Sequence, residues 1–127
     1  MNKTILISIL LFNFFTVFSQ NQIHKSITNT FIQNFNNSDF GKIIQTFSEK
    51  MRNSKSKEYF LNFFSRVKKE NGSILNLELL KYNENTEKKS QATYNGILEK
   101  GEVTIKITTD IDGQIIGLYI LKNKIYL

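Results

Sequence analysis

The stretch VTIKITTDIDGQIIGLYI, residues 103–120, decides the fold. Val103, Ile105 and Ile107 alternate with polar residues, as expected of a strand with one buried face. A second apolar run follows Gln114, and Asp112-Gly113 between the two runs favours a two-residue type I′ hairpin turn. The stretch therefore predicts two neighbouring antiparallel strands.

The Asp-x-Asp-Gly motif also occurs in calcium loops, and the ligand positions of an EF-hand loop decide whether this stretch could be one. An EF-hand loop requires oxygen ligands at positions 1, 3 and 5, Gly at 6 and Glu at 12. When Asp110 and Asp112 occupy the third and fifth positions, Thr108 comes first and Tyr119 last. Tyr119 offers no carboxylate, and the flanking sequence is strand-like. We therefore expect a turn and no metal site.

Two more strands are expected upstream, because Leu75, Leu77 and Leu79 alternate with polar residues and should face the core. The four expected strands cover about Ser73–Tyr82, Ser90–Glu99, Val103–Thr109 and Gln114–Leu121, with an extension toward Tyr126 as an alternative.

Asn95-Gly96 and Lys100-Gly101 both suit the turn between the second and third strands. Lys100-Gly101 gives strands of more equal length. Gly96 should then be a bulge or a close packing contact.

Before Gly72 the apolar period lengthens to that of helices. A first helix is expected over Gln22–Phe35, a second over Phe40–Phe47, and a third around Phe60–Val67 that ends near Gly72. A polar stretch, Arg52–Lys57, separates the last two. The chain should form an α+β domain, with three N-terminal helices packed on a curved four-stranded antiparallel sheet.

Residues 1–19 are typical of a cleaved signal peptide: Lys3 is followed by an uncharged, mostly apolar run, Ile5–Phe18, and then by the small residue Ser19. A spanning helix needs about 20 apolar residues, which is longer than this run. We expect export to the periplasm or the medium, a single domain over residues 20–127, and no membrane span after cleavage.

Composition narrows the partners. The chain has no cysteine, which excludes a lipid-anchored cysteine, disulfides and thiolate metal sites. Loss of Lys3 with the leader lowers the basic residues from 17 to 16, against 11 acidic residues, a formal charge of +5. Such a charge suits anionic partners, but export argues against nucleic acid.

Catalysis needs proton carriers or metal ligands brought together in a pocket. The single histidine, His24, lies near the start of the first helix and is expected to be exposed. Glu78, Glu99 and Glu102 have the strand parity opposite to the core and should face solvent. Residues 20–127 contain no nucleophile motif or glycine-rich phosphate loop. We predict no catalytic residue, no cofactor and no metal.

The abundant aromatic residues are most simply core, but they also suit a cavity between the helices and the sheet, with Tyr94 as its polar contact. The candidate cavity residues are Phe47, Phe60, Phe64, Tyr94 and Leu118. The sheet face of opposite parity is more apolar than a solvated face should be, so we expect a partner there, most simply a second copy. The candidate interface residues are Leu80, Ile97, Ile115, Tyr119 and Leu121.

The segments FGKIIQTFSEKM, EYFLNFFSRVKKENGSILNLELLKY and ATYNGILEKGEVTIKITTDIDGQIIGLYI resemble an uncharacterised bacterial family, domain of unknown function 3887. The resemblance covers Phe31–Leu121 and is most specific at Phe47–Met51, Asn71–Ile74 and Asp110–Leu118. The family looks like the nuclear-transport-factor-2-like, cystatin-like superfamily, which implies a cone-shaped fold. The leader, ending in Phe-Ser-Gln, looks like those of Bacteroidetes.

Similar family members often precede a serine hydrolase or β-lactamase-like domain, so the resemblance implies an accessory role in a secreted system. The motifs mark packing and turns, and no catalytic residue is carried over. We expect an exported, non-catalytic module that binds a small apolar or amphipathic ligand or docks onto an envelope protein. One alternative is a cone-fold isomerase or dehydratase that recruits Tyr94 or Tyr59 with a carboxylate. Another is a purely structural interaction domain.

Overall fold

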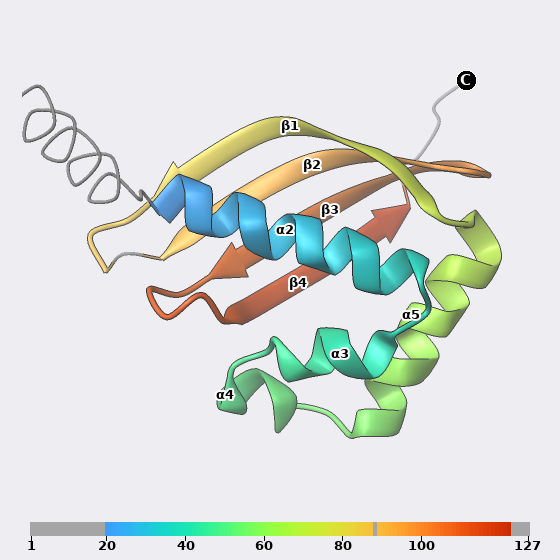
Figure 1. Cartoon of the computed structure of the whole chain (residues 1–127), viewed down its shortest axis with the longest axis horizontal. Helices are drawn as coiled ribbons and strands as arrows, with labels where there is room; N and C mark the ends of the chain where they lie inside the picture. Colours follow the sequence, from blue (N-terminus) through green and yellow to red (C-terminus); the bar gives the residue numbers. More distant parts are fainter. Residues whose placement is uncertain (1–19, 88, 123–127) are drawn as a thin grey trace, which may run out of the picture.

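The computed structural model describes residues 20–87 and 89–122 of the 127-residue chain. The expected signal peptide, residues 1–19, and the extension of the last strand toward Tyr126 lie outside the described residues. Within the described ranges four helices come first and a four-stranded antiparallel sheet follows (Figure 1). The predicted α+β architecture, helices before sheet, is confirmed.

Three of the helices are those that the apolar spacing predicted. They are α2 (Gln20–Asn36), α3 (Phe40–Gln45) and α5 (Lys57–Asn71). A further short helix, α4 (Glu49–Arg52), begins where the Ser48 side chain accepts a hydrogen bond of 3.2 Å from the backbone N–H of Met51. Periodicity misses α4 because four residues are too few to show a helical stripe.

The second helix is shorter than expected because its last residues leave the helix and join the sheet. Phe47 pairs with Ile115 in a parallel bridge. The N–H of Ile115 donates to the carbonyl of Thr46, and the N–H of Ser48 donates to the carbonyl of Ile115, both at 2.9 Å. These bonds hold Phe47 beside the first residue of β4.

The sheet has the order β1-β2-β3-β4, so each strand pairs with the next along the chain. The strands are β1 (Ile74–Glu84), β2 (Ser90–Leu98), β3 (Gly101–Thr109) and β4 (Ile115–Lys122). Glu99 and Lys100 form the turn between β2 and β3, one position before the expected dipeptide. Gly96 lies in the ladder, where a Cβ would be 3.1 Å from Val103 Cγ2. It is the expected close packing contact.

The Asp112-Gly113 segment is a turn, as expected, but of a different type. The N–H of Asp110 donates to the carbonyl of Gln114 at 3.0 Å, which leaves three residues in the loop. Gly113 has a φ of +79°, whereas Asp112 is not among the residues with positive φ. The predicted two-residue type I′ turn is therefore wrong, and the loop is a three-residue hairpin with a left-handed glycine.

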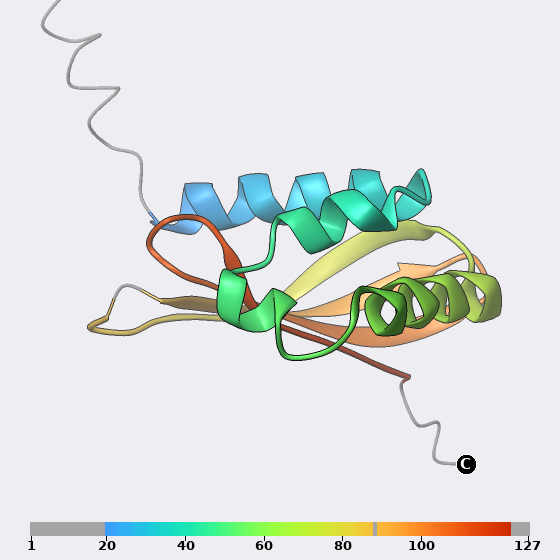
Figure 2. The ribbon, with the colours of Figure 1, turned by 90° about the horizontal axis from the view of Figure 1, so that it is seen from below.

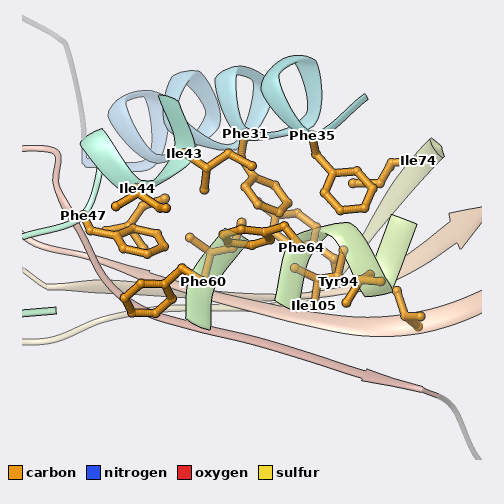
Figure 3. Packing of buried hydrophobic residues seen from close by; sticks show 14 of the residues in the cluster. Phe31, Phe35, Ile43, Ile44, Phe47, Phe60, Phe64, Ile74, Tyr94 and Ile105 are labelled. Atoms are coloured by element: carbon orange, nitrogen blue, oxygen red, sulfur yellow. The ribbon is translucent and has the colours of Figure 1, made fainter. Parts of the chain in front are cut away.

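The helices cover one face of the sheet, and the core lies between the two layers (Figure 2). Figure 3 shows Phe31 and Phe35 pointing from α2 toward Phe64 and Tyr94. Removing this apolar surface from water supplies the main driving force for folding. The sheet contributes Ile74, Ala92, Tyr94, Leu98, Val103, Ile105, Ile107 and Ile115, all buried.

One strand departs from the predicted facing. Leu75 and Leu79 were expected in the core but are 66% and 53% exposed. The pairing of β1 with β2 shifts between Ile74 and Asn76 and again between Leu79 and Lys81. Each irregularity interrupts the alternation of inward and outward side chains along β1. Because β1 is also an edge strand, it has a neighbouring strand on one side only, and Leu75 and Leu79 stay partly exposed to solvent.

Candidate functional site

Several hollows open on the described part of the molecule, and two of them, one beside each edge strand, have largely apolar walls. The first lies among α4, α5 and β4, has a volume of about 250 Å³, and is called the aromatic groove below. Its floor is formed by Phe47, Phe60 and Phe64, which are buried. Its rim carries Tyr59, Tyr119 and Leu121, which are 52%, 60% and 62% exposed.

Helix spacing and the bridge to β4 together build the groove floor. Phe60 and Phe64 are four residues apart and therefore lie on the same side of α5. The ring of Phe47 meets that of Phe60 edge to face, with centroids 5.2 Å apart and planes at 75°. Phe47, Phe60 and Phe64 come from two separate segments but form one cluster (Figure 3).

Two cations that do not themselves line the groove lie over the rings of residues that do. Lys55 Nζ is 5.4 Å from the ring centroid of Tyr59, and the Arg66 guanidinium carbon is 5.8 Å from that of Phe63. Both distances are within the range of a cation–π contact. The groove thus has an apolar floor, and cations contact two of its aromatic side chains.

The second hollow lies between α2 and β1, has a volume of about 350 Å³, and is called the α2–β1 hollow. The helix supplies Lys25, Thr28, Asn29 and Ile32, whose spacing of three and four residues places them on one face. Apolar and tyrosine side chains of the sheet complete the wall: Ile74, Leu75, Leu77, Leu79, Tyr82 and Tyr94.

Asn76 and two tyrosines, Tyr82 and Tyr94, are the polar residues on the sheet side of this hollow. The hydroxyl of Tyr94 is 3.2 Å from Thr28 Oγ1, and that of Tyr82 donates to Glu84 Oε1 at 2.7 Å. Burial raises the pKa of Tyr94, and burial together with the Glu84 hydrogen bond raises the pKa of Tyr82 to about 12. Both phenols are therefore neutral at physiological pH.

The five candidate cavity residues divide between these hollows. Phe47, Phe60, Phe64 and Leu118 all line the aromatic groove. Tyr94 lines the α2–β1 hollow. The strand parity of Tyr94 correctly predicted that the side chain is buried, since Tyr94 is 7% exposed. Parity does not indicate which part of the core a residue faces.

The candidate interface residues do not form one patch. Leu80, Tyr119 and Leu121 are exposed and Ile97 is half-buried. Leu80 lies on β1 and Tyr119 on β4, at opposite edges of the sheet. The paired residues Thr93 and Lys106 fill the row between them, since Lys106 pairs with both Thr93 and Tyr119. The face is apolar at its edges and polar at its centre.

Ile115 was expected on that outer face, and this expectation is wrong. Thr108 pairs with Gly117 and Thr109 with Ile115, so Ile116 is an extra residue in β4. This bulge turns Ile115 to the same face as the buried Thr109. Ile115 is fully buried in the core.

His24 was also placed wrongly by the sequence analysis, because it is 1% exposed. Its Nδ1 is 3.0 Å from Ser90 Oγ, and that hydroxyl is 2.7 Å from Thr109 Oγ1. Its Nε2 is buried without a hydrogen-bond partner among the described residues. Burial lowers the pKa of the imidazole, so it is neutral at physiological pH.

A signal for this burial existed in the sequence. His24, Thr28, Phe31 and Phe35 are spaced by four, three and four residues, which is one helical face, and all four are buried. Counting only apolar residues on the helix hid the two polar members of the stripe. Polar residues in such a stripe must find buried partners, here Ser90 and Tyr94.

The His24–Ser90 pair resembles a base beside a hydroxyl nucleophile, but its burial argues for a structural role. Ser90 is 0% exposed, and neither residue lines the groove or the hollow. A nucleophile must reach the substrate. The pair instead joins α2 to β2, and Thr109 extends the contact to β3.

Glu78, Glu99 and Glu102 are exposed, as expected.

Over residues 20–87 and 89–122, no three His, Asp or Glu side chains are grouped so that they could hold a metal ion. None of the described helices combines the length and the apolar character that crossing a bilayer requires.

Comparison with known proteins identifies a family without an assigned activity. Residues 28–118 match the model of the family described as "Protein of unknown function (DUF3887)". No curated protein and no solved structure matches the chain. The match covers the helices from the middle of α2 and the sheet as far as Leu118 in β4.

Proposed function

We propose a function from the site itself, because the chain belongs to the DUF3887 family, whose description assigns no activity. The protein is an exported, non-catalytic binding module that holds the apolar part of a small amphipathic molecule in the aromatic groove. The observation that carries this proposal is the pairing of a buried phenylalanine floor with the exposed rim residues Tyr59, Tyr119 and Leu121. Export rests on the leader-like residues 1–19.

The size and lining of the groove indicate the kind of ligand. Ligand pockets commonly measure about 300–1,000 Å³, so a hollow of about 250 Å³ encloses only part of a ligand. Each methylene that leaves water contributes about 0.8 kcal/mol. A single alkyl chain on the aromatic floor, with its polar end toward solvent near Lys55 and Arg66, suits this geometry.

The position of the titratable groups supports a non-catalytic role. The residues that line the groove include no Asp, Glu or His. The enzyme alternative needs Tyr94 or Tyr59 beside a carboxylate, whereas the hydroxyl of Tyr94 lies next to Thr28. The structural alternative needs a continuous apolar sheet face, and Thr93 and Lys106 interrupt that face.

Binding of a neutral fluorescent probe, N-phenyl-1-naphthylamine, tests the proposal. Tyr119→Ser and Leu121→Ser remove rim side chains, and Leu80→Ser removes a side chain of similar exposure, 64%, on the opposite edge strand. We expect one saturable site whose Kd rises about fivefold or more in each rim variant, because each loses about 1 kcal/mol or more of apolar contact. Leu80→Ser should bind like the parent chain. Equal losses in all three variants, or no saturable binding, would contradict the proposal.

A further inference from the structure

We propose that the α2–β1 hollow is a second binding site, separate from the aromatic groove, for a small monoanionic amphiphile such as a medium-chain carboxylate. Its volume of about 350 Å³ falls within the range of small-molecule pockets. It lies beside β1, whereas the groove lies beside β4, at the other edge of the sheet. The two sites share no lining residue.

The charge of the hollow selects the ligand class. Among the described side chains that line it, Lys25 alone is charged at neutral pH, and over the described residues Lys25 makes no ion pair. The nearby phenols of Tyr82 and Tyr94 are neutral. A carboxylate gains a charged hydrogen bond at Lys25 and an amide donor at Asn29, whereas an amine is repelled.

The apolar wall indicates the rest of the ligand. Leu79 and Leu75 border the hollow and remain 53% and 66% exposed. Lys25 and Ile32 are seven residues apart on α2, which is about 10.5 Å along the helix axis. A chain of medium length can therefore reach from Lys25 to Ile32 while it covers the leucines. The wall also holds Leu77, which packs against the core.

A hydrogen bond holds the polar groups of the floor in place. The hydroxyl of Tyr94 is fixed against Thr28 at 3.2 Å, so the floor is ordered before a ligand arrives. Preorganised groups cost less entropy on binding than mobile ones. The site thus combines one cation, an ordered hydroxyl pair and exposed leucines within one hollow.

The test compares three ligands with the same eight-carbon chain: octanoate, octan-1-ol and octylammonium. Each is titrated into the full chain, and the backbone amides are followed by NMR. We expect octanoate to bind tighter than the other two and to shift the amides of Thr28, Asn29 and Leu79. Lys25→Met keeps the length of the side chain and should weaken octanoate about fivefold, the effect of one solvent-exposed ion pair. Lys57→Met, at the start of α5 and in neither hollow, is the matched control and should change nothing.

Three results would overturn the inference: octanol shifting Thr28, Asn29 and Leu79 as readily as octanoate, an equal effect of Lys25→Met and Lys57→Met, or octanoate shifts confined to the aromatic groove. The two sites are tested separately. Lys25→Met should leave binding of the neutral probe at the groove intact, and Tyr119→Ser should leave the octanoate-induced shifts of Thr28, Asn29 and Leu79 intact.

Discussion

The buried histidine makes folding stability depend on pH in a predictable direction. His24 is neutral in the folded chain because burial lowers its pKa below the ordinary value of 6.5. In the unfolded chain it binds a proton near that ordinary value. The unfolded state therefore takes up more protons as the pH falls, and stability declines with acidification. His24 is the single histidine in the sequence, so the effect has one source in this pH range.

The magnitude follows from the same linkage. Lowering the pH from about 7.5 to 5.5 should remove at most about 1.4 kcal/mol from the free energy of unfolding, the loss for an imidazole that stays neutral in the folded chain over the whole range. The groups that face His24 are the hydroxyls of Ser90 and Thr109 and the rings of Tyr82 and Tyr94. None of these four groups titrates in this range, so they do not offset the loss.

Urea denaturation followed by circular dichroism at a series of pH values measures this effect. His24→Gln keeps a polar side chain beside Ser90 but cannot titrate, so its stability should be flatter with pH even though its absolute stability is lower. An NMR titration of the His24 ring reports the folded-state pKa directly. The reasoning is refuted if the parent and His24→Gln lose stability in parallel, or if the parent becomes more stable at lower pH.

Two further predictions concern backbone and side-chain contacts between the helices and the sheet. Gly72→Ala should destabilise the chain by about 1–3 kcal/mol, because φ is +82° and the new Cβ would lie 2.7 Å from Glu99 Cβ. Gly41→Ala, with nothing within 4 Å of its Cβ, should be neutral or stabilising in the same thermal denaturation assay, and equal losses would contradict the argument. Asn36→Ala should cost about 1–3 kcal/mol in denaturant unfolding, because its amide bonds both the N–H and the carbonyl of Ile74, at 2.8 and 2.9 Å. A loss below about 0.5 kcal/mol would mean that water replaces those bonds.

Apolar and polar side chains occupy separate parts of the interior. Phe47, Phe60 and Phe64 fill the end of the core beside β4. His24, near the start of α2, forms a separate polar cluster with Ser90 of β2 and Thr109 of β3. Each hydrogen bond in such a cluster contributes modestly, but leaving one of its buried groups unpaired is costly. The cluster therefore fixes the position of α2, which forms one wall of the α2–β1 hollow.

Local patterns in the sequence were sufficient for every described helix and strand except the short helix α4, and for their order. Alternation in residues 103–109 predicted β3, and the spacing of Phe60, Phe63 and Phe64 predicted α5, because each pattern reports one buried face of one element. Gly96 was correctly expected as a close contact. Turn residues located both hairpins to within about one residue, although the type of the second was wrong.

The groove residues were named from burial and aromatic character, and four of them do lie together. Their assembly depends on the bridge between Phe47 and Ile115, which joins residues far apart in the chain. No local pattern encodes such a pairing. The division of the candidates into two hollows was therefore not predictable from periodicity.

The sequence by itself determined three of the four described helices, the strands, their order and most of the buried faces, because these depend on side-chain periods of 3.6 and 2 within single elements. Only the tertiary structure decided the facing of Ile115, the burial of His24 and the exposure of Leu75 and Leu79. In each case the outcome depends on contacts between elements, which the period within one element does not report. A bulge reverses strand parity, an edge strand lacks a neighbour, and a polar side chain is buried when distant partners such as Ser90 and Thr109 satisfy it.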